Sequence, residues 1–363
     1  MFTIMADKII RMGIIGYGGM ARWHHMMMQT QDNLGIQAVA VYDISEAANM
    51  KAKEDGLRVC SSAAELLCKD DIDVVLIATP NDWHKPYAFQ AMDAGIDVIC
   101  EKPVTLCSAD LQEMIDKANE TGLMMTVHQN RRWDPDYRAI LKVRDEGTIG
   151  NIFKIESRVS GANGIPGDWR AVKSEGGGMI LDWGVHLIDQ ICDAYKEKIT
   201  QVYARVQHIT NQEVDDGFMA VLTFETGLVA VLEVTTTTYV NYPRWHVSGL
   251  YGTIQIDDWD LNGKIVREVA KQGHDELVPI QAGVGLTKTM SPRSSSTVEE
   301  LPVPKVGGQH IEDEWRKFYD NIVAHINHGV PFIVKHDEVM RVMKVMEAIF
   351  QSEAENRAID TYL

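Results

Sequence analysis

Ile10-Arg11-Met12-Gly13-Ile14-Ile15-Gly16-Tyr17-Gly18-Gly19-Met20-Ala21 is the stretch that decides the fold of this chain. The apolar run over 9–15 is typical of a buried strand, and the glycines after it open a helix over 19–31. In the pattern G-x-G-x-x-A, the first glycine permits a tight turn and the second lets the backbone approach a pyrophosphate, which would lie at the helix amino terminus. The alanine permits close packing of helix on strand. The stretch predicts dinucleotide binding by Gly16, Tyr17, Gly18, Gly19 and Met20; a glycine turn that binds nothing is the alternative.

Strand-like and helix-like segments alternate from this stretch through the first third of the chain. Repeated βα units of this length predict a parallel, right-handed, doubly wound sheet, which is the Rossmann arrangement. The expected strands cover 9–15, 38–42, 58–60, 74–77, 97–100 and 124–127, and the expected helices cover 19–31, 45–55, 63–67, 83–94 and 109–121. We therefore expect a dinucleotide-binding Rossmann domain over residues 1–129.

The pattern changes after Asn130-Arg131-Arg132-Trp133, where short β-rich runs follow one more helix. Glu225-Thr226-Gly227 lies between two such runs and is typical of a hairpin, so a largely antiparallel sheet is expected. Its strands are expected over 153–159, 202–207, 219–224, 229–236, 245–250 and 253–256, with helices over 135–146, 179–195, 311–327 and 337–355 and a long loop over 283–304. Residues 130–363 are thus expected to form a second α/β domain.

Composition and charge exclude several classes of partner. The chain has 363 residues, of which 45% are hydrophobic, and a formal net charge of −17, which disfavours nucleic acid and anionic membranes. No apolar run approaches the ~20 residues of a membrane-spanning helix, and the first residues do not resemble a signal peptide. Five cysteines without a CxxC pair favour reduced thiols, so a cytoplasmic protein is expected.

Polar residues at two further strand ends extend the expected dinucleotide site. Asp43 ends the second strand, where an acid accepts hydrogen bonds from the ribose hydroxyls and repels a 2′-phosphate, so NAD is favoured over NADP. A helix cap before Ser45 is the alternative role for Asp43. Thr79, Asn81 and His84 follow the fourth strand and are expected to line the nicotinamide end, although a turn-and-cap role suits Asn81 nearly as well.

Glu101-Lys102-Pro103 places a cation at the end of the apolar run Asp97-Val98-Ile99-Cys100. Lysine is seldom buried without a partner, and the carboxyl ends of strands are where open α/β sheets bind ligands. Lys102 is therefore a candidate site residue. A loop lysine with its ammonium group in water is the alternative.

Asp182 and His186 follow Gly176-Gly177-Gly178 and would share one face of a helix, because they are four residues apart. A neutral imidazole is the natural general base for an alcohol proton near neutral pH, and Asp182 would orient it or hold a neighbouring substrate hydroxyl. A metal pair is the rival interpretation, but no further ligands follow at metal spacing, and no metal is expected. The third interpretation is a purely structural salt bridge between Asp182 and His186 within the helix.

Taken together, these motifs make the sequence resemble the glucose-fructose oxidoreductase/inositol dehydrogenase (Gfo/Idh/MocA) family over essentially its whole length. The matching pieces are Gly16–Ala21, Thr79-Pro80-Asn81 with His84, Glu101-Lys102-Pro103, Asn130-Arg131-Arg132, Trp169-Arg170 and Asp182-x-x-x-His186. The resemblance implies that Lys102, Asp182 and His186 form the catalytic set, with Lys102 bonding the reacting hydroxyl and His186 taking its proton. It also implies that Glu101, Lys102, Trp169 and Arg170 lie by the cofactor. The second domain would bind the substrate, and its open sheet would mediate a homodimer, homotetramer or larger homo-oligomer.

The family resemblance also implies a class of substrate. Its members mostly act on sugars and polyols, so oxidation of a secondary ring hydroxyl is expected, and the C3 hydroxyl of a sugar or glycoside is the favoured target. An inositol dehydrogenase, or a redox-neutral sugar enzyme that keeps NAD bound, is the alternative. The long loop 283–304 suggests a larger substrate such as a glycoside, and Trp23 is either an aromatic wall for it or core packing.

Overall fold

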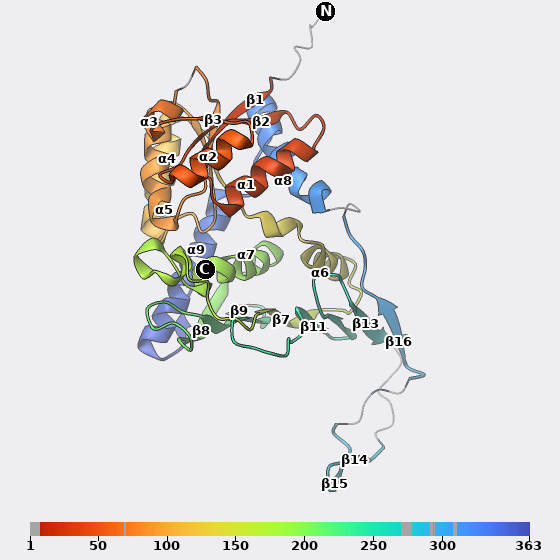
Figure 1. Cartoon of the computed structure of the whole chain (residues 1–363). Helices are drawn as coiled ribbons and strands as arrows, with labels where there is room; N and C mark the ends of the chain where they lie inside the picture. The colour runs from red at the N-terminus through yellow and green to blue at the C-terminus, as the bar shows by residue number, and fades with distance from the viewer. Residues whose placement is uncertain (1–7, 69, 270–277, 291–292, 294, 308–310) are drawn as a thin grey trace, which may run out of the picture.

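The computed structural model describes residues 8–68, 70–269, 278–290, 293, 295–307 and 311–363. Among these residues, two large sheets lie one above the other in Figure 1, with helices around the upper sheet and between the two. No helix in this part of the chain is both long and apolar enough to cross a membrane. All five cysteines fall within it and are free thiols. The parallel-plus-mixed α/β architecture confirms the expected fold class.

The first sheet is parallel, has the order β3-β2-β1-β4-β5-β6 within the described residues, and is therefore doubly wound. Its strands carry the buried apolar runs that the sequence predicts, and β4 is buried at all four positions. The elements are β1 (Ile10–Ile15), α1 (Gly19–Thr30), β2 (Ile36–Tyr42), α2 (Glu46–Glu54), β3 (Arg58–Val59), α3 (Ala63–Leu66), β4 (Val74–Ile77), η1 (Asn81–Trp83), α4 (His84–Asp93), β5 (Asp97–Cys100), α5 (Ser108–Thr121) and β6 (Met125–Val127).

The second sheet has the order β16-β13-β12-β11-β7-β10-β9-β8-β17 in the described part of the chain. All neighbours are antiparallel except β7 and β10, so the sheet is mixed rather than purely antiparallel. Its strands are β7 (Ile152–Ser160), β8 (Ile199–Gln207), β9 (Gly217–Phe224), β10 (Val229–Thr235), β11 (Trp245–Gly249), β12 (Gly252–Ile256), β13 (Gly263–Glu268), β16 (Val298–Pro302) and β17 (Ile359–Asp360).

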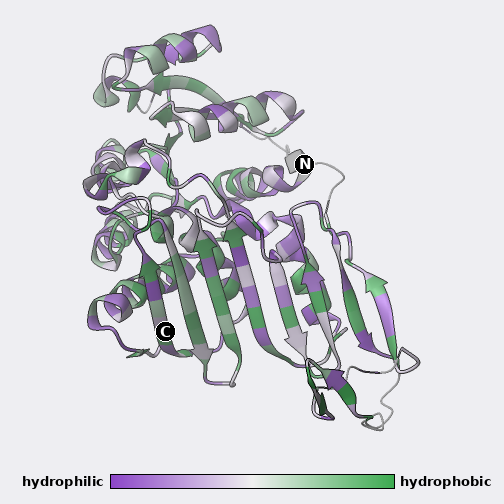
Figure 2. Ribbon diagram, turned by 60° about the horizontal axis from the view of Figure 1, so that its bottom comes forward, coloured by the Kyte–Doolittle hydropathy of each residue, from purple (hydrophilic) through white to green (hydrophobic). Residues whose placement is uncertain are grey.

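Among the described residues, helices pack on only one face of this second sheet. Figure 2 turns the other face of the sheet toward the viewer, and the helices lie behind the strands. Strand β9 alternates between buried and half-buried residues, as expected for a sheet that is covered on one side. The remaining elements are η2 (Asn130–Trp133), α6 (Pro135–Asp145), η3 (Trp169–Ala171), η4 (Lys173–Glu175), η5 (Ile180–Gly184), α7 (Val185–Ala194), α8 (Ile311–His328) and α9 (His336–Glu355).

Two regions differ from the sequence-based expectation. The stretch 283–304 is not one loop, because it contains β15 (Gly285–Thr287), which pairs with β14 (Ile280–Ala282), and the sheet-edge strand β16. The β14–β15 hairpin projects away from both large sheets (Figure 1), so within one chain it does not shape the pocket described below. Helix α8 lies beside α1, where Arg316 donates to the carbonyl oxygen of Asp32 at 2.7 Å, although the sequence assigns it to the second domain.

Candidate active site

A pocket of about 870 Å³ lies at the carboxyl edge of the parallel sheet, where this sheet faces the second half of the chain. The loops after β1, β2, β4 and β5 form one side, and η3 and η5 form the other, as the carboxyl-edge rule for open α/β sheets predicts. Its lining residues are Ile15, Gly16, Gly18, Gly19, Met20, Tyr42, Asp43, Ile44, Ala78, Thr79, Pro80, Asn81, Asp82, Trp83, Tyr87, Glu101, Lys102, Asp168, Trp169, Arg170, Glu175 and Asp182.

The glycine loop between β1 and α1 fits a pyrophosphate. Gly16 has φ = 87°, and a Cβ there would lie 2.7 Å from the carbonyl oxygen of Ala78, so only glycine permits this turn. A Cβ at Gly18 or Gly19 would meet no described atom within 4 Å, which leaves an open approach to the backbone. Helix α1 has no side-chain cap and no acidic residue in its first turn, so its free N–H groups remain available to an anion.

Asp43 lies at the end of β2 beside this loop and lines the pocket. Its Oδ2 accepts from the backbone N–H of Tyr17 at 2.6 Å, and its Oδ1 accepts from that of Ser45 at 2.7 Å. The carboxylate therefore holds the two loop segments on either side of it and also lines the pocket, while the N-cap of α2 is Ser45 rather than Asp43. Binding of the ribose by Asp43 stays a prediction. The side chain of Tyr17, predicted to bind the cofactor, is instead buried away from the pocket, where its hydroxyl contacts His25 and Asp55.

Lys102 reaches across from β5 to the second half of the chain. Its Nζ donates to the backbone oxygen of Asp182 at 2.8 Å and to Oδ1 of Asp182 at 3.2 Å. Arg170 donates from Nε to the other carboxylate oxygen at 3.0 Å. Burial alone would raise the pKa of Asp182, but the charges of Lys102 and Arg170 outweigh burial and hold it below its ordinary value. The lysine is therefore a paired, half-enclosed cation, and the alternative of a loop lysine in water is wrong.

His186 is buried beside this group but does not pair with Asp182 as the four-residue spacing suggests. Residues Ile180–Gly184 form a π-helical turn, and α7 begins only at Val185, so the two side chains do not keep the spacing of an α-helix. Within the described residues, Nδ1 of His186 has no hydrogen-bond partner. Burial, followed by the charge of Lys102, holds the pKa of His186 well below its ordinary value, so the imidazole is neutral near pH 7.

Comparison with known proteins agrees with this architecture. Residues 10–129 match the NAD-binding Rossmann-fold domain of an oxidoreductase family, and residues 137–255 match the C-terminal domain of the same family. The chain belongs to the Gfo/Idh/MocA oxidoreductases. It is thus an NAD(P)-binding oxidoreductase whose first third is the dinucleotide-binding part.

Individual relatives within the Gfo/Idh/MocA family differ in cofactor and substrate. A solved structure of an NAD-binding protein from Listeria innocua is 43% identical, covers 98% of this chain and 100% of its own, and superposes with a TM-score of 0.91. The scyllo-inositol 2-dehydrogenase (NADP⁺) of Bacillus subtilis is 26% identical over 359 residues, or 96% of this chain and 95% of the relative. A D-glucoside 3-dehydrogenase of Escherichia coli is 28% identical over 193 residues, or 52% of this chain and 55% of the relative.

The remaining predicted cofactor residues divide into pocket-lining and supporting groups. Thr79 lines the pocket, and its Oγ1 is buried without a partner among the described residues, so it remains free to bond a ligand. Asn81 also lines it and donates to the carbonyl oxygen of Gly176 at 2.9 Å, which ties the two halves together. The structure corrects the prediction that His84 lines the nicotinamide end. Its Nδ1 bonds to the backbone oxygen of Pro103 and its Nε2 to that of Thr79, and the residue lies outside the pocket. Trp169 lines the pocket, and the guanidinium of Arg170 lies 4.5 Å from its ring.

Glu101 anchors a buried cluster behind Lys102 that the sequence does not reveal. Its Oε1 lies 2.8 Å from Nε2 of His24 and 2.9 Å from Nδ1 of His128, while Tyr319 of α8 lies 2.8 Å from Nδ1 of His24. Burial lowers the pKa of His24 to about 4, so this ring is neutral and acts as a donor to the carboxylate. Although these residue types also bind metals, the two hydrogen bonds already join the carboxylate directly to both rings. The cluster fixes the strand end that carries Lys102.

Asp215, in the loop between β8 and β9, positions the segment that carries Asp182 and His186. Its Oδ2 accepts from the backbone N–H of Ile180 at 2.7 Å, and its carbonyl oxygen accepts from that of Met179 at 3.0 Å. Gly178 has φ = 107°, and a Cβ there would collide with the carboxylate of Asp215, which explains why glycine precedes this segment. No local pattern marks Asp215 in the sequence, because its partners lie about 35 residues earlier.

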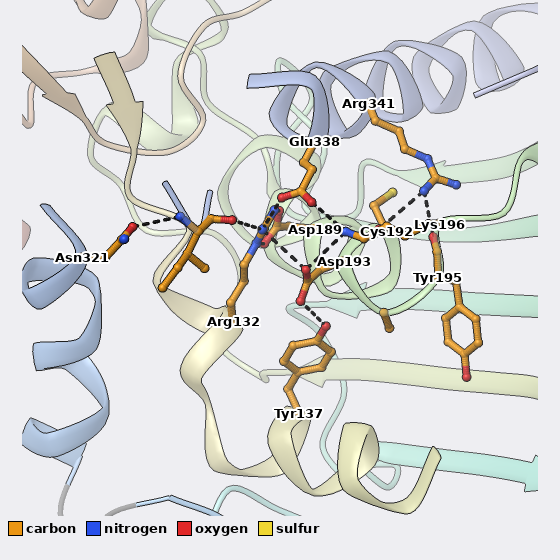
Figure 3. A network of polar contacts seen from close by, with 12 residues as sticks. Arg132, Tyr137, Asp189, Cys192, Asp193, Tyr195, Lys196, Asn321, Glu338 and Arg341 are labelled. Atoms are coloured by element: carbon orange, nitrogen blue, oxygen red, sulfur yellow. Dashed lines mark hydrogen bonds and ion pairs between the residues drawn. The ribbon is translucent and has the colours of Figure 1, made fainter. Parts of the chain in front are cut away.

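A buried ionic network holds α7 from its other side (Figure 3). Arg132 of η2 donates to both carboxylate oxygens of Asp189 on α7, at 2.9 and 2.7 Å, and to Glu338 of α9 at 2.6 Å. Tyr137 of α6 donates to Asp193 at 2.6 Å. Bidentate pairing of this kind fixes geometry as well as charge. Arg132, part of a predicted family motif, therefore supports the helix that bears His186.

Proposed function

We propose that this oxidoreductase oxidises a secondary ring hydroxyl of a sugar or glycoside with NAD. One observation carries the proposal: the paired ammonium of Lys102 and the carboxylate of Asp182 line the pocket, and behind them lies the neutral imidazole of His186, whose Nδ1 has no partner among the described residues. An alcohol oxidation needs a donor that holds the hydroxyl oxygen and a base that takes its proton. This arrangement contains both.

The residues divide the chemistry between them. A bound nicotinamide dinucleotide supplies the hydride acceptor, held by the glycine loop and the free N–H groups of α1. Lys102 donates to the substrate oxygen, and the neutral imidazole of His186 takes the hydroxyl proton. Asp182 holds Nζ of Lys102 in place and balances its charge, while Arg170 fixes the second oxygen of Asp182. The hydroxyl carbon is left free to release hydride.

The preference for NAD rests on Asp43. Its carboxylate lines the pocket at the end of β2. There it would accept hydrogen bonds from the ribose hydroxyls and repel a 2′-phosphate. Ile44, which also lines the pocket, offers no positive charge to a phosphate. We therefore propose NAD as the working cofactor, although one relative carries NADP⁺ in its name.

The attacked position is proposed to be the C3 hydroxyl of a glucose-type ring. The support is the name of one relative, a D-glucoside 3-dehydrogenase. Oxidation of an inositol is the second candidate, because another relative is a scyllo-inositol 2-dehydrogenase. Association of several copies through the helix-free face of the second sheet stays an expectation of the family resemblance.

Two substitutions test the catalytic assignment. The purified protein is mixed with NAD or NADP and with glucose, glucosides or inositols, and reduced cofactor is followed by absorbance and product by mass. Lys102→Met and His186→Gln should each lower kcat by a factor on the order of 10²–10⁴, because acid–base help is lost. Lys85→Met is the control, since Lys85 pairs with Asp110 and Glu113 outside the pocket. Unchanged turnover in both active-site variants would contradict the assignment of Lys102 and His186 as catalytic residues.

A further inference from the structure

Trp259 is a half-exposed aromatic residue near the catalytic group. It lies in the turn between β12 and β13, and 48% of its surface is exposed. Its ring centroid is 6.0 Å from that of Trp183, which is in turn 5.8 Å from the ring of His186. The three rings therefore form a row that begins at His186 and ends in solvent.

The turn that carries Trp259 is braced by hydrogen bonds. Asp258 accepts from the backbone N–H groups of Asp260 and Asn262, at 3.0 and 3.1 Å, and from the side-chain amide of Asn262 at 2.7 Å. Leu261 adopts φ = 64°, a conformation that a residue with a branched side chain rarely takes without compensating contacts. Such strain is frequent where a turn has to present a side chain at a site. The turn therefore fixes the backbone from which Trp259 projects.

Two guanidinium groups stack on these indoles, and both have their charge balanced nearby. Arg131 lies 4.3 Å from the ring of Trp183 and 5.3 Å from that of Trp259, and Arg244 lies 4.7 Å from Trp259. Arg131 pairs with Asp134 at 2.9 Å, and Arg244 pairs with Asp136 at 3.2 Å. Because each cation has its own carboxylate, the row presents aromatic surface without a net charge. Such a surface suits an uncharged ring rather than an anion.

We infer that Trp259 is the outer wall of the substrate site and contacts the aglycone of a glycoside, that is, the uncharged group on the anomeric carbon. The inference rests on the proposed function, since it takes His186 as the base at the oxidised hydroxyl. A sugar ring that places a hydroxyl at His186 lies against Trp183. Trp259 is one ring further out, within reach only of a group attached to that sugar. Trp23, the other candidate for an aromatic wall, instead packs edge-on against Trp315 at 5.7 Å.

The experiment compares phenyl glucoside with methyl glucoside, which share the sugar and differ in aglycone. Trp259→Ala should raise KM for phenyl glucoside about tenfold, because ring contact is lost, and leave kcat within about twofold. KM for methyl glucoside should change less than about twofold. Trp259→Phe keeps a ring and should retain most of the affinity for phenyl glucoside. Tyr362→Ala, at an exposed aromatic residue that contacts Lys198, is the matched control.

Each result decides one question. An equal effect of Trp259→Ala on both glucosides, or no effect on either, overturns the inference and leaves the proposed function standing. A wild-type protein that oxidises neither glucosides, free sugars nor inositols overturns the proposed function, and the inference falls with it. Thermal unfolding of each variant shows whether a raised KM reflects a folded protein.

Discussion

The proposed dinucleotide site and the proposed catalytic site of this protein are encoded in different ways. The glycine loop would bind through the backbone, and all its parts lie within one short stretch from Gly16 to Ala21. The proposed catalytic site relies on side chains from distant segments, such as Lys102 with Asp182, which are 80 residues apart. A backbone site needs only the right turn and helix, whereas a side-chain site needs the whole tertiary structure. Local sequence therefore reveals the first site in detail and the second only in outline.

Glu101 is an exception to this difference, because it belongs to a short motif but bonds to two distant partners, His24 and His128. Glu101→Ala should lower the free energy of unfolding by about 3 kcal/mol, since two buried imidazole N–H groups lose their acceptor. Chemical denaturation measures the effect. Glu113→Ala is the control, because this exposed glutamate forms only a surface ion pair with Lys85 and should change stability by less than about 1 kcal/mol. If both variants are equally stable, Glu101 is not an anchor.

Substitutions at Gly16 and Gly18 distinguish an effect on folding from an effect on binding in the proposed dinucleotide site. Gly16→Ala should lower the free energy of unfolding by about 2 kcal/mol, because φ = 87° is strained for alanine and its Cβ would meet the carbonyl oxygen of Ala78. Gly18→Ala should change stability by less than about 0.5 kcal/mol, since no described atom lies near the new Cβ.

Dinucleotide binding distinguishes the two variants further. Isothermal titration with NAD should show weaker binding for Gly18→Ala even though this variant is as stable as the wild type, because the Cβ would occupy the approach to the pyrophosphate. Equal NAD affinity in Gly18→Ala and the wild type would show that the pyrophosphate does not bind at this loop.

The smallest expected effect is on the pH dependence of kcat/KM, which concerns the proposed catalytic site. The pKa of His186 lies below its ordinary value of about 6.5, so the base stays neutral as the pH falls from 7.5 to 6.5. Activity should fall by well under the roughly twofold expected for a base of ordinary pKa. Unfolded His186 takes up a proton near pH 6.5 and the folded form does not, so stability should also decline as the pH falls below that value.

Two carboxylates near this segment titrate in the same range, because burial raises the pKa of Asp215 to about 6 and that of Asp134, which pairs with Arg131 beside Trp183, also to about 6. Measuring the profile in Asp215→Asn removes the contribution of Asp215. A midpoint at or above pH 6.5 in that variant would contradict a buried neutral base at His186.

The agreement between sequence and structure follows the same division. The parallel, doubly wound first sheet and the glycine turn at Gly16 could be predicted, because repeated βα units and backbone chemistry leave few alternatives. The cofactor roles of Gly16, Gly18 and Asp43 stay predictions. Motif position predicts that Tyr17 and His84 bind the cofactor, but their side chains turn into the protein. His24, His128, Asp215 and Trp259 carry no local pattern at all, since what defines them is a partner far along the chain. Strands β13 to β17 were missed because they are short or half-exposed.

The π-helical turn Ile180–Gly184 has a consequence for how homologous sequences are to be aligned. A π turn contains one residue more than an α turn, which is the signature of a single inserted residue within a helix. Each residue of an α-helix turns by about 100°, so deleting one residue here would swing Asp182 by more than a quarter turn relative to His186 and away from Lys102. A relative that lacks this residue therefore has to place its carboxylate at a different alignment column to reach the same lysine.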